Sequence, residues 1–189
     1  MSVILLRHTR LAAVEGLCYG RTDVPLAVSF ANELAVIRAG LAGVRWGAVW
    51  SSPAARCQQL AAALALEAGV KIFTEPRLQE LDFGAWENRP WEIFRGRQSE
   101  AWALDPWSLA PPGGESGAQL WARVGEFRTE LLGEVTSGSS CADGASILVV
   151  THAGVIRAWL GLERGLSWAE AMSLPVQHGS LTKINPCGR

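Results

Sequence analysis

Three short segments of the sequence contain the side chains best suited to hold a phosphate group. They are Arg7-His8, Arg56 and His152. The planar guanidinium of arginine matches phosphate oxygens two at a time, and an imidazole can add a further hydrogen-bond donor. Taken singly, an arginine is more often a surface ion-pair partner, and a lone histidine is more often a hydrogen-bonded structural group. A function for these residues therefore depends on whether the fold brings them together.

The elements around these segments predict that they do meet. Short apolar, partly β-branched runs indicate buried strands, and apolar residues at helical spacing indicate helices between them. The predicted strands are Val3–Leu6, Ala48–Ser51, Val70–Phe73, Ser146–Val150 and an edge strand Ser180–Ile184, and the predicted helices are Ser29–Leu41, Ala54–Ala68, Ser116–Val135 and Gly154–Leu162. This alternation predicts a three-layer α/β/α sandwich with a mostly parallel central sheet.

In such a sheet, ligands collect at the carboxyl ends of the strands. His8 and His152 each follow a predicted strand, and Arg56 lies in the first turn of a predicted helix. Ser52-Pro53 offers that helix an N-cap and a first-turn proline, and the free N–H groups of a helix start favour an anion. The sequence therefore predicts a phosphate cradle at this edge of the sheet.

Between about residues 76 and 114 the periodic pattern fails. Prolines and glycines break this stretch into short helix-like pieces, at Pro90–Gly96 and Ser99–Leu104, and we interpret it as an insertion or lid over the sheet. Five of the nine tryptophans fall here or just beyond: Trp86, Trp91, Trp102, Trp107 and Trp121. They either pack the insertion onto the sheet or wall an apolar pocket that stacks on an aromatic leaving group. Thr136–Ala145 is expected to be a surface loop.

The composition narrows the class of protein. A chain of 189 residues is the size of one domain, and we expect residues 1–189 to form one. With 17 Lys and Arg against 18 Asp and Glu, no overall field favours nucleic acid or an anionic membrane. The four cysteines have no zinc-like spacing, and no apolar run is long enough to span a membrane or to form a signal-peptide core. We expect a cytoplasmic protein with reduced thiols.

Four motifs, in order, resemble those of a known family. They are Leu6-Arg7-His8-Thr9, Ser51-Ser52-Pro53-Ala54-Ala55-Arg56, the run from Leu78 to Glu87, and Val149-Val150-Thr151-His152-Ala153-Gly154. This order resembles the histidine phosphatase superfamily, also called phosphoglycerate mutase-like, over nearly the whole chain. The runs Tyr19–Leu26 and Glu80–Glu87 are most similar to the α-ribazole phosphatase branch, which acts late in the assembly of the cobalamin nucleotide loop.

The resemblance implies a role for each motif residue. His8 is the nucleophile, Arg7, Arg56 and His152 hold the phosphoryl oxygens, and Glu80 gives a proton to the leaving alcohol. The chemistry is consistent, because a neutral imidazole can attack phosphorus while arginines stabilise the equatorial oxygens without a metal or other cofactor. Asp82 and Glu87 lie in the same segment as Glu80, and the sequence alone does not decide which carboxylate reaches the leaving oxygen.

Several other candidate pocket residues allow two interpretations each. Thr9 stands where most members of the family have glycine, and its hydroxyl either binds a phosphate oxygen or narrows the pocket. His178 either lines the pocket mouth or is an edge-strand histidine. Glu115 and Ser116 either contact substrate or cap a helix, and Arg21, in the run most similar to the branch, is a further candidate contact.

The predicted function is hydrolysis of a small phosphomonoester through a phosphohistidine, with α-ribazole 5′-phosphate or a cobalamin 5′-phosphate as the favoured substrate. The alternatives among enzymes are a broad-specificity sugar or nucleotide phosphatase and a phosphoglycerate mutase, the latter disfavoured because such enzymes are usually longer. A phosphate-binding module without activity is suggested by Thr9 and Arg10. A metallohydrolase has no supporting spacing of ligands. The sequence does not indicate the oligomeric state.

Overall fold

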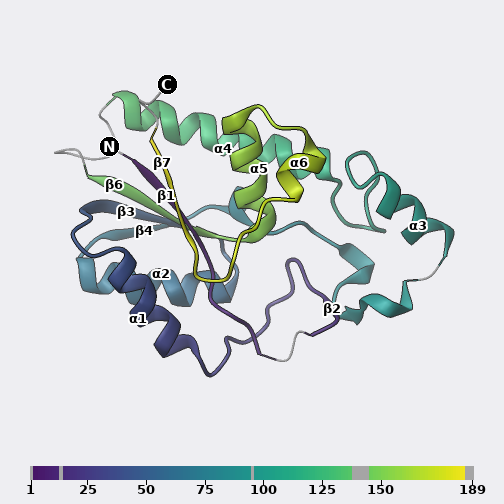
Figure 1. Ribbon diagram of the computed structural model, residues 1–189, viewed down its shortest axis with the longest axis horizontal. Coiled ribbons are helices and arrows are strands. Elements are labelled where there is room, and N and C mark those ends of the chain that lie inside the picture. The colour runs from purple at the N-terminus through teal and green to yellow at the C-terminus, as the bar shows by residue number, and fades with distance from the viewer. Residues whose placement is uncertain (1, 13–14, 95, 138–144, 186–189) are drawn as a thin grey trace.

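The computed structural model of the chain describes residues 2–12, 15–94, 96–137 and 145–185. Its centre is a five-stranded sheet in the order β4-β3-β6-β1-β7 (Figure 1). The strands are β1 (Val3–Arg7), β3 (Trp46–Ser51), β4 (Lys71–Thr74), β6 (Ser146–Thr151) and β7 (Leu181–Ile184). The first four run parallel and β7 pairs antiparallel with β1 at the edge, which confirms the predicted, mostly parallel sheet.

Helices cover both faces of this sheet (Figure 1). One face carries α1 (Phe30–Gly40) and α2 (Ala55–Ala68), and the other carries α4 (Gly117–Ser137), α5 (Ala153–Arg164) and α6 (Trp168–Met172). Successive side chains of β1 point to opposite faces, so Val3 and Leu5 join one buried cluster while Ile4 and Leu6 join the other. The central strands are buried on both faces, which explains their continuous apolar runs.

The predicted elements are largely present, with corrections at their ends. Ser52 does not cap α2: the N-cap position is Ala54, and the Ser52 hydroxyl instead accepts a hydrogen bond from the Ala54 N–H. Thr136 and Ser137 belong to α4 rather than to the predicted loop Thr136–Ala145, of which residues 138–144 lie outside the described part of the chain. Cys18 and Cys57 are free thiols, whereas Cys141 and Cys187 lie outside the described part.

The irregular stretch that follows β4 contains more structure than the sequence predicted. It holds the 3-10 turns η1 (Pro76–Leu78), η2 (Gly84–Trp86) and η3 (Trp91–Ile93), and the helix α3 (Arg97–Leu104). Its strand β5 (Arg89–Pro90) pairs with β2 (Leu17–Cys18) in a separate two-stranded sheet. Neither this small sheet nor α6 was predicted, because two-residue strands and a five-residue helix show no periodicity. No described helix is long and apolar enough to cross a membrane.

Candidate active site

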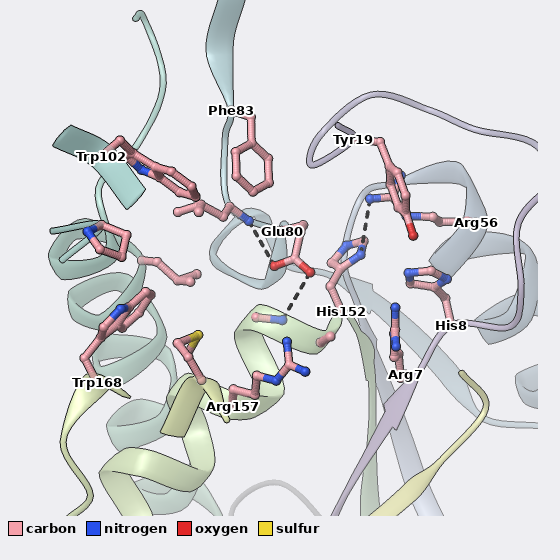
Figure 2. Close-up of a pocket in the computed structure, with 16 residues that line it drawn as sticks. Arg7, His8, Tyr19, Arg56, Glu80, Phe83, Trp102, His152, Arg157 and Trp168 are labelled. Carbon is pink, nitrogen blue, oxygen red and sulfur yellow. Dashed lines mark hydrogen bonds between the residues drawn. The ribbon is translucent and has the colours of Figure 1, made fainter. Parts of the chain in front are cut away.

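The predicted phosphate-binding residues come together in one pocket at the carboxyl ends of β1 and β6. The pocket has a volume of about 410 Å³, and Arg7, His8, Arg56, Glu80 and His152 all line it (Figure 2). Arg7 ends β1, and His8 follows it. His152 follows β6 as the N-cap residue of α5, and Arg56 lies in the first turn of α2. Parallel neighbouring strands end at the same edge, which is why these distant segments meet.

His8 has one ring nitrogen occupied and the other available. Its Nδ1 lies 2.8 Å from the carbonyl oxygen of Thr9. A carbonyl only accepts hydrogen bonds, so Nδ1 carries the proton and Nε2 keeps its lone pair. Burial, together with the nearby charges of Arg56 and Arg7, lowers the pKa of His8 to about 3. His8 is therefore neutral at physiological pH, as an attacking imidazole must be.

His152 lies beside His8, with 5.3 Å between the ring centroids. Its Nδ1 is 3.3 Å from Nη2 of Arg56, which can only donate, so Nδ1 accepts and Nε2 donates to the Ser52 hydroxyl at 2.8 Å. Complete burial lowers the pKa of His152 well below its usual value, and Arg56 adds to the effect. Both imidazoles are thus neutral in the folded protein.

The two arginines are each held by a backbone carbonyl. Nη1 of Arg7 donates to the Val176 carbonyl at 2.7 Å, and Nη1 of Arg56 donates to the Thr22 carbonyl at 2.7 Å. Arg56 is 1% exposed, yet no carboxylate forms an ion pair with it or with Arg7 among the described residues. A buried and a partly buried guanidinium group, neither in an ion pair with a carboxylate of the described chain, create an electropositive corner suited to an anion.

Glu80 lies between this corner and the rest of the pocket (Figure 2). Its Oε1 accepts a hydrogen bond from the Leu81 N–H at 3.0 Å, and its Oε2 accepts one from the Gly154 N–H at 3.1 Å. The two other candidate carboxylates do not line the pocket. Asp82 pairs with Arg21 and accepts from the Gly84 N–H, and Glu87 accepts the N–H groups of Arg21 and Phe83.

A sequence model of the histidine phosphatase superfamily (branch 1) matches residues 3–189. The chain belongs to the histidine phosphatase superfamily. Curated relatives include a bifunctional protein of Mycobacterium tuberculosis, 30% identical over 165 residues, which cover 85% of this chain and 43% of that protein. The chain thus spans less than half the length of the first mycobacterial relatives.

Two further similarities concern α-ribazole phosphatases. The adenosylcobalamin/alpha-ribazole phosphatase of Escherichia coli is 28% identical over 176 residues, covering 91% of this chain and 83% of that one. The crystal structure of the alpha-ribazole phosphatase from Shigella flexneri has a TM-score of 0.85 at 24% identity, covering 98% of this chain and 90% of that one. The structural likeness confirms the predicted fold of this member of the superfamily.

The side of the pocket beyond Glu80 is apolar and partly aromatic. Its lining includes Leu81, Phe83, Trp102, Leu120, Trp168 and Met172. Of the five tryptophans that the sequence placed near the insertion, only Trp102 lines this pocket; Trp86 and Trp91 pack around it, and Trp107 and Trp121 pack against Trp168. Most of the cluster therefore packs the insertion, and a smaller part faces the pocket.

Some pocket residues of this histidine phosphatase were not singled out from the sequence. Tyr19, Arg157, Trp168 and Met172 line the pocket. Arg157 lies on α5 three residues after Gly154, so helical spacing from the His152 motif would have indicated it. Tyr19 begins the run Tyr19–Leu26 that carries the family resemblance, in the loop between β2 and α1, but no role was assigned to it. Trp168 and Met172 lie in the unpredicted α6, where no local pattern pointed to a site.

Arg21, Glu115 and Ser116, predicted as candidate substrate contacts, lie outside the residues that line the pocket. Ser116 caps α4: its N–H donates to Gln119 Oε1 at 2.8 Å, and its hydroxyl accepts from the Gln119 N–H at 3.3 Å. Glu115 and Arg21 contact each other at 3.4 Å behind the backbone of Glu80. Their positions give no support to substrate contact.

Thr9 and His178 lie next to His8 but not on the pocket lining. Thr9 is completely buried, and its hydroxyl has no partner among the described residues. The ring of His178 stands 5.3 Å from that of His8 in an edge-on contact. His178 therefore packs behind the predicted nucleophile.

Proposed function

We propose that this protein hydrolyses small phosphomonoesters through a phosphohistidine formed on His8. The observation that carries the proposal is the state of His8: its Nδ1–H donates to the Thr9 carbonyl, and a pKa of about 3 keeps Nε2 unprotonated beside two arginines. This geometry gives an imidazole a lone pair for attack and surrounds the transferring group with fixed positive charge.

The reaction proceeds in two steps. In the first, Nε2 of His8 attacks phosphorus, the bond from phosphorus to the alcohol oxygen breaks, and the carboxylic acid of Glu80 gives that oxygen its proton. In the second, the Glu80 carboxylate takes a proton from water, the water oxygen attacks phosphorus, and the phosphorus–nitrogen bond breaks to restore neutral His8. Arg7, Arg56 and His152 hold the phosphoryl oxygens in both steps.

For the substrate, we propose a phosphomonoester with an apolar ring system beyond the leaving oxygen, such as α-ribazole 5′-phosphate or adenosylcobalamin 5′-phosphate. Phe83, Trp102 and Trp168 on the far side of Glu80 support this proposal, because their faces suit an aromatic ring. The name of the Escherichia coli relative supports it as well.

The intermediate provides the direct test of mechanism. The enzyme is mixed with a radiolabelled phosphomonoester, quenched, and digested for mass spectrometry. We expect an acid-labile, base-stable phosphate on His8, and none in the variant His8→Gln, whose folding is checked by circular dichroism. Label on another residue, or turnover that persists in His8→Gln, would overturn the mechanism.

The alternatives give different results in a substrate comparison. The proposal predicts a higher kcat/KM for α-ribazole 5′-phosphate than for ribose 5-phosphate or 3-phosphoglycerate. Equal values would indicate a broad-specificity phosphatase, isomerised phosphoglycerate would indicate a mutase, and binding without turnover would indicate a binding module. Turnover that requires added metal would indicate a metallohydrolase, an alternative that no group of three or more acidic, histidine or cysteine side chains supports in the described ranges.

A further inference from the structure

Arg123 is a partly buried arginine that hydrogen-bonds to Glu115 and to the backbone leading to Glu80. It projects from α4, and its side chain is 14% exposed. Nε donates to Glu115 Oε1 at 2.6 Å, and Nη2 donates to Glu115 Oε2 at 2.8 Å. This two-point contact fixes the plane of the guanidinium, because both parallel N–H groups are engaged at once.

The remaining donors of Arg123 bind the backbone that leads to Glu80. Nη1 donates to the carbonyls of Arg77 at 2.6 Å and Gln79 at 2.7 Å, and Nη2 donates to the carbonyl of Glu80 at 3.1 Å. Residues 79–83 belong to no helix or strand, so these side-chain donors replace the hydrogen bonds that regular structure would supply.

The backbone and the side chain of Glu80 are thus held by different sets of donors. Its carbonyl accepts from Arg123, and also from Nε of Arg21 at 3.4 Å. Its carboxylate accepts from Leu81 and Gly154 on the pocket side. The Arg123–Glu115 pair fixes where the backbone of Glu80 lies, and this in turn sets where its carboxylate can reach.

We propose that Arg123, locked by Glu115, is the positioning residue for the proton donor Glu80. This inference rests on the proposed function, in which Glu80 protonates the leaving alcohol. Proton transfer requires hydrogen-bond distance to the leaving oxygen, and a displacement of about 1 Å can cost roughly 10²-fold in rate. Arg123 is not among the residues that line the pocket, and its hydrogen bond to the Glu80 carbonyl is the link through which it acts on the proton transfer.

A residue that positions Glu80 affects the rate in a way that depends on the leaving group, whereas a purely structural arginine does not. A basic alkoxide needs the acid, whereas p-nitrophenolate leaves without one. In Arg123→Lys the ammonium keeps the charge opposite Glu115 but cannot reach three carbonyls and two carboxylate oxygens together. We expect its rate of phosphorylation to fall roughly 10- to 10²-fold with ribose 5-phosphate, and to stay close to wild type with p-nitrophenyl phosphate.

The experiment is a single-turnover measurement with enzyme in excess over radiolabelled substrate, because substrate disappearance then reports the first chemical step alone. Arg123→Lys, Glu115→Gln, Glu80→Gln and the double variant Arg123→Lys with Glu80→Gln are compared on both substrates. When Glu80→Gln is already present, adding Arg123→Lys should cause no further decrease in rate that depends on the leaving group. Arg128→Lys is the matched control, since Arg128 lies on the same helix and pairs with Glu163 on α5.

The outcomes separate this inference from the proposed function. The positioning role of Arg123 is supported if Arg123→Lys lowers the rate more with ribose 5-phosphate than with p-nitrophenyl phosphate, and if this difference disappears when Glu80→Gln is also present. The inference is overturned if the single-turnover rate falls equally on both substrates, if it falls on neither, or if the losses from Arg123→Lys and Glu80→Gln simply add. None of these results contradicts a phosphohistidine on His8. If Arg123→Lys does not fold by circular dichroism, Glu115→Gln decides the question. Failure of both to fold would overturn the inference, because the pair would then be structural. Absence of phosphohistidine in the wild type would overturn the proposed function and this inference with it.

Discussion

The carboxylate of Glu80 lies directly against the backbone of Gly154. The Gly154 N–H donates to Glu80 Oε2 at 3.1 Å, and a Cβ on residue 154 would stand 2.3 Å from Oε1. Only glycine therefore allows the carboxylate to keep this position. The first turn of α5, which follows His152, in this way also determines the place of the proposed acid.

Gly154→Ala should consequently displace Glu80 while leaving α5 intact, because alanine is a better helix former than glycine. We expect the single-turnover rate with ribose 5-phosphate to fall on the order of 10²-fold, and the rate with p-nitrophenyl phosphate to fall much less. Gly125→Ala on α4 is the control, since the nearest atom to its added Cβ is 3.5 Å away. Equal rates in Gly154→Ala and wild type would contradict the proposed role of Glu80.

Replacing either pocket arginine, Arg7 or Arg56, should remove stabilisation of the transferring phosphoryl group. Arg7→Ala and Arg56→Ala are each expected to lower kcat/KM by about 10²- to 10³-fold, or ~2.7–4 kcal/mol, as for loss of one transition-state donor. Arg56→Ala should also lower the melting temperature, because the Thr22 carbonyl loses its donor. Arg38→Ala, which breaks an exposed ion pair with Glu67, should change neither property appreciably. Near-normal activity in either pocket variant would show that its arginine does not bind phosphate.

Stability should fall as the pH drops below about 6.5, because His8 and His178 are held neutral by the fold. Burial lowers their pKa values to about 3 and about 4, whereas the unfolded chain protonates them near pH 6.5. The unfolded state then binds more protons, and each histidine contributes a loss of up to about 1.4 kcal/mol per pH unit until the folded pKa is reached. The slope is obtained from the free energy of urea unfolding measured between roughly pH 6.5 and pH 5. Ordinary carboxylates titrate below this pH range, so they contribute little to the slope. A slope unchanged in His8→Asn would contradict the prediction.

Trp102 should select for an aromatic leaving group. It lines the apolar side of the pocket, where a ring on the substrate would meet its face. Trp102→Leu is expected to raise KM for α-ribazole 5′-phosphate and to leave KM for ribose 5-phosphate nearly unchanged. Trp46→Leu serves as control, because Trp46 packs into the cluster on the opposite face of the sheet. Equal changes in KM for the two substrates would exclude stacking on Trp102.

Local patterns in the sequence were sufficient for the five-stranded sheet, for its covering helices other than α6, and for the meeting of the predicted phosphate-binding residues. Val3–Leu6 and Ser146–Val150 are continuous apolar runs because strands at the centre of a sandwich are buried on both faces. Once these strands are parallel neighbours, Arg7, His8 and His152 must lie at one edge, and no knowledge of the remaining chain is needed. The family resemblance added their roles, which local patterns do not contain.

Only the tertiary structure decided which of three neighbouring carboxylates lines the pocket, and which residues form the apolar side of the pocket. Glu80, Asp82 and Glu87 are chemically alike and close in sequence, and they lie outside any helix or strand whose period would fix their directions. Glu80 faces the pocket because Arg123 holds its backbone and Gly154 leaves room for its carboxylate, whereas the other two are turned towards Arg21. These contacts join residues that are 43 and 74 positions apart, so they exist only after the chain has folded.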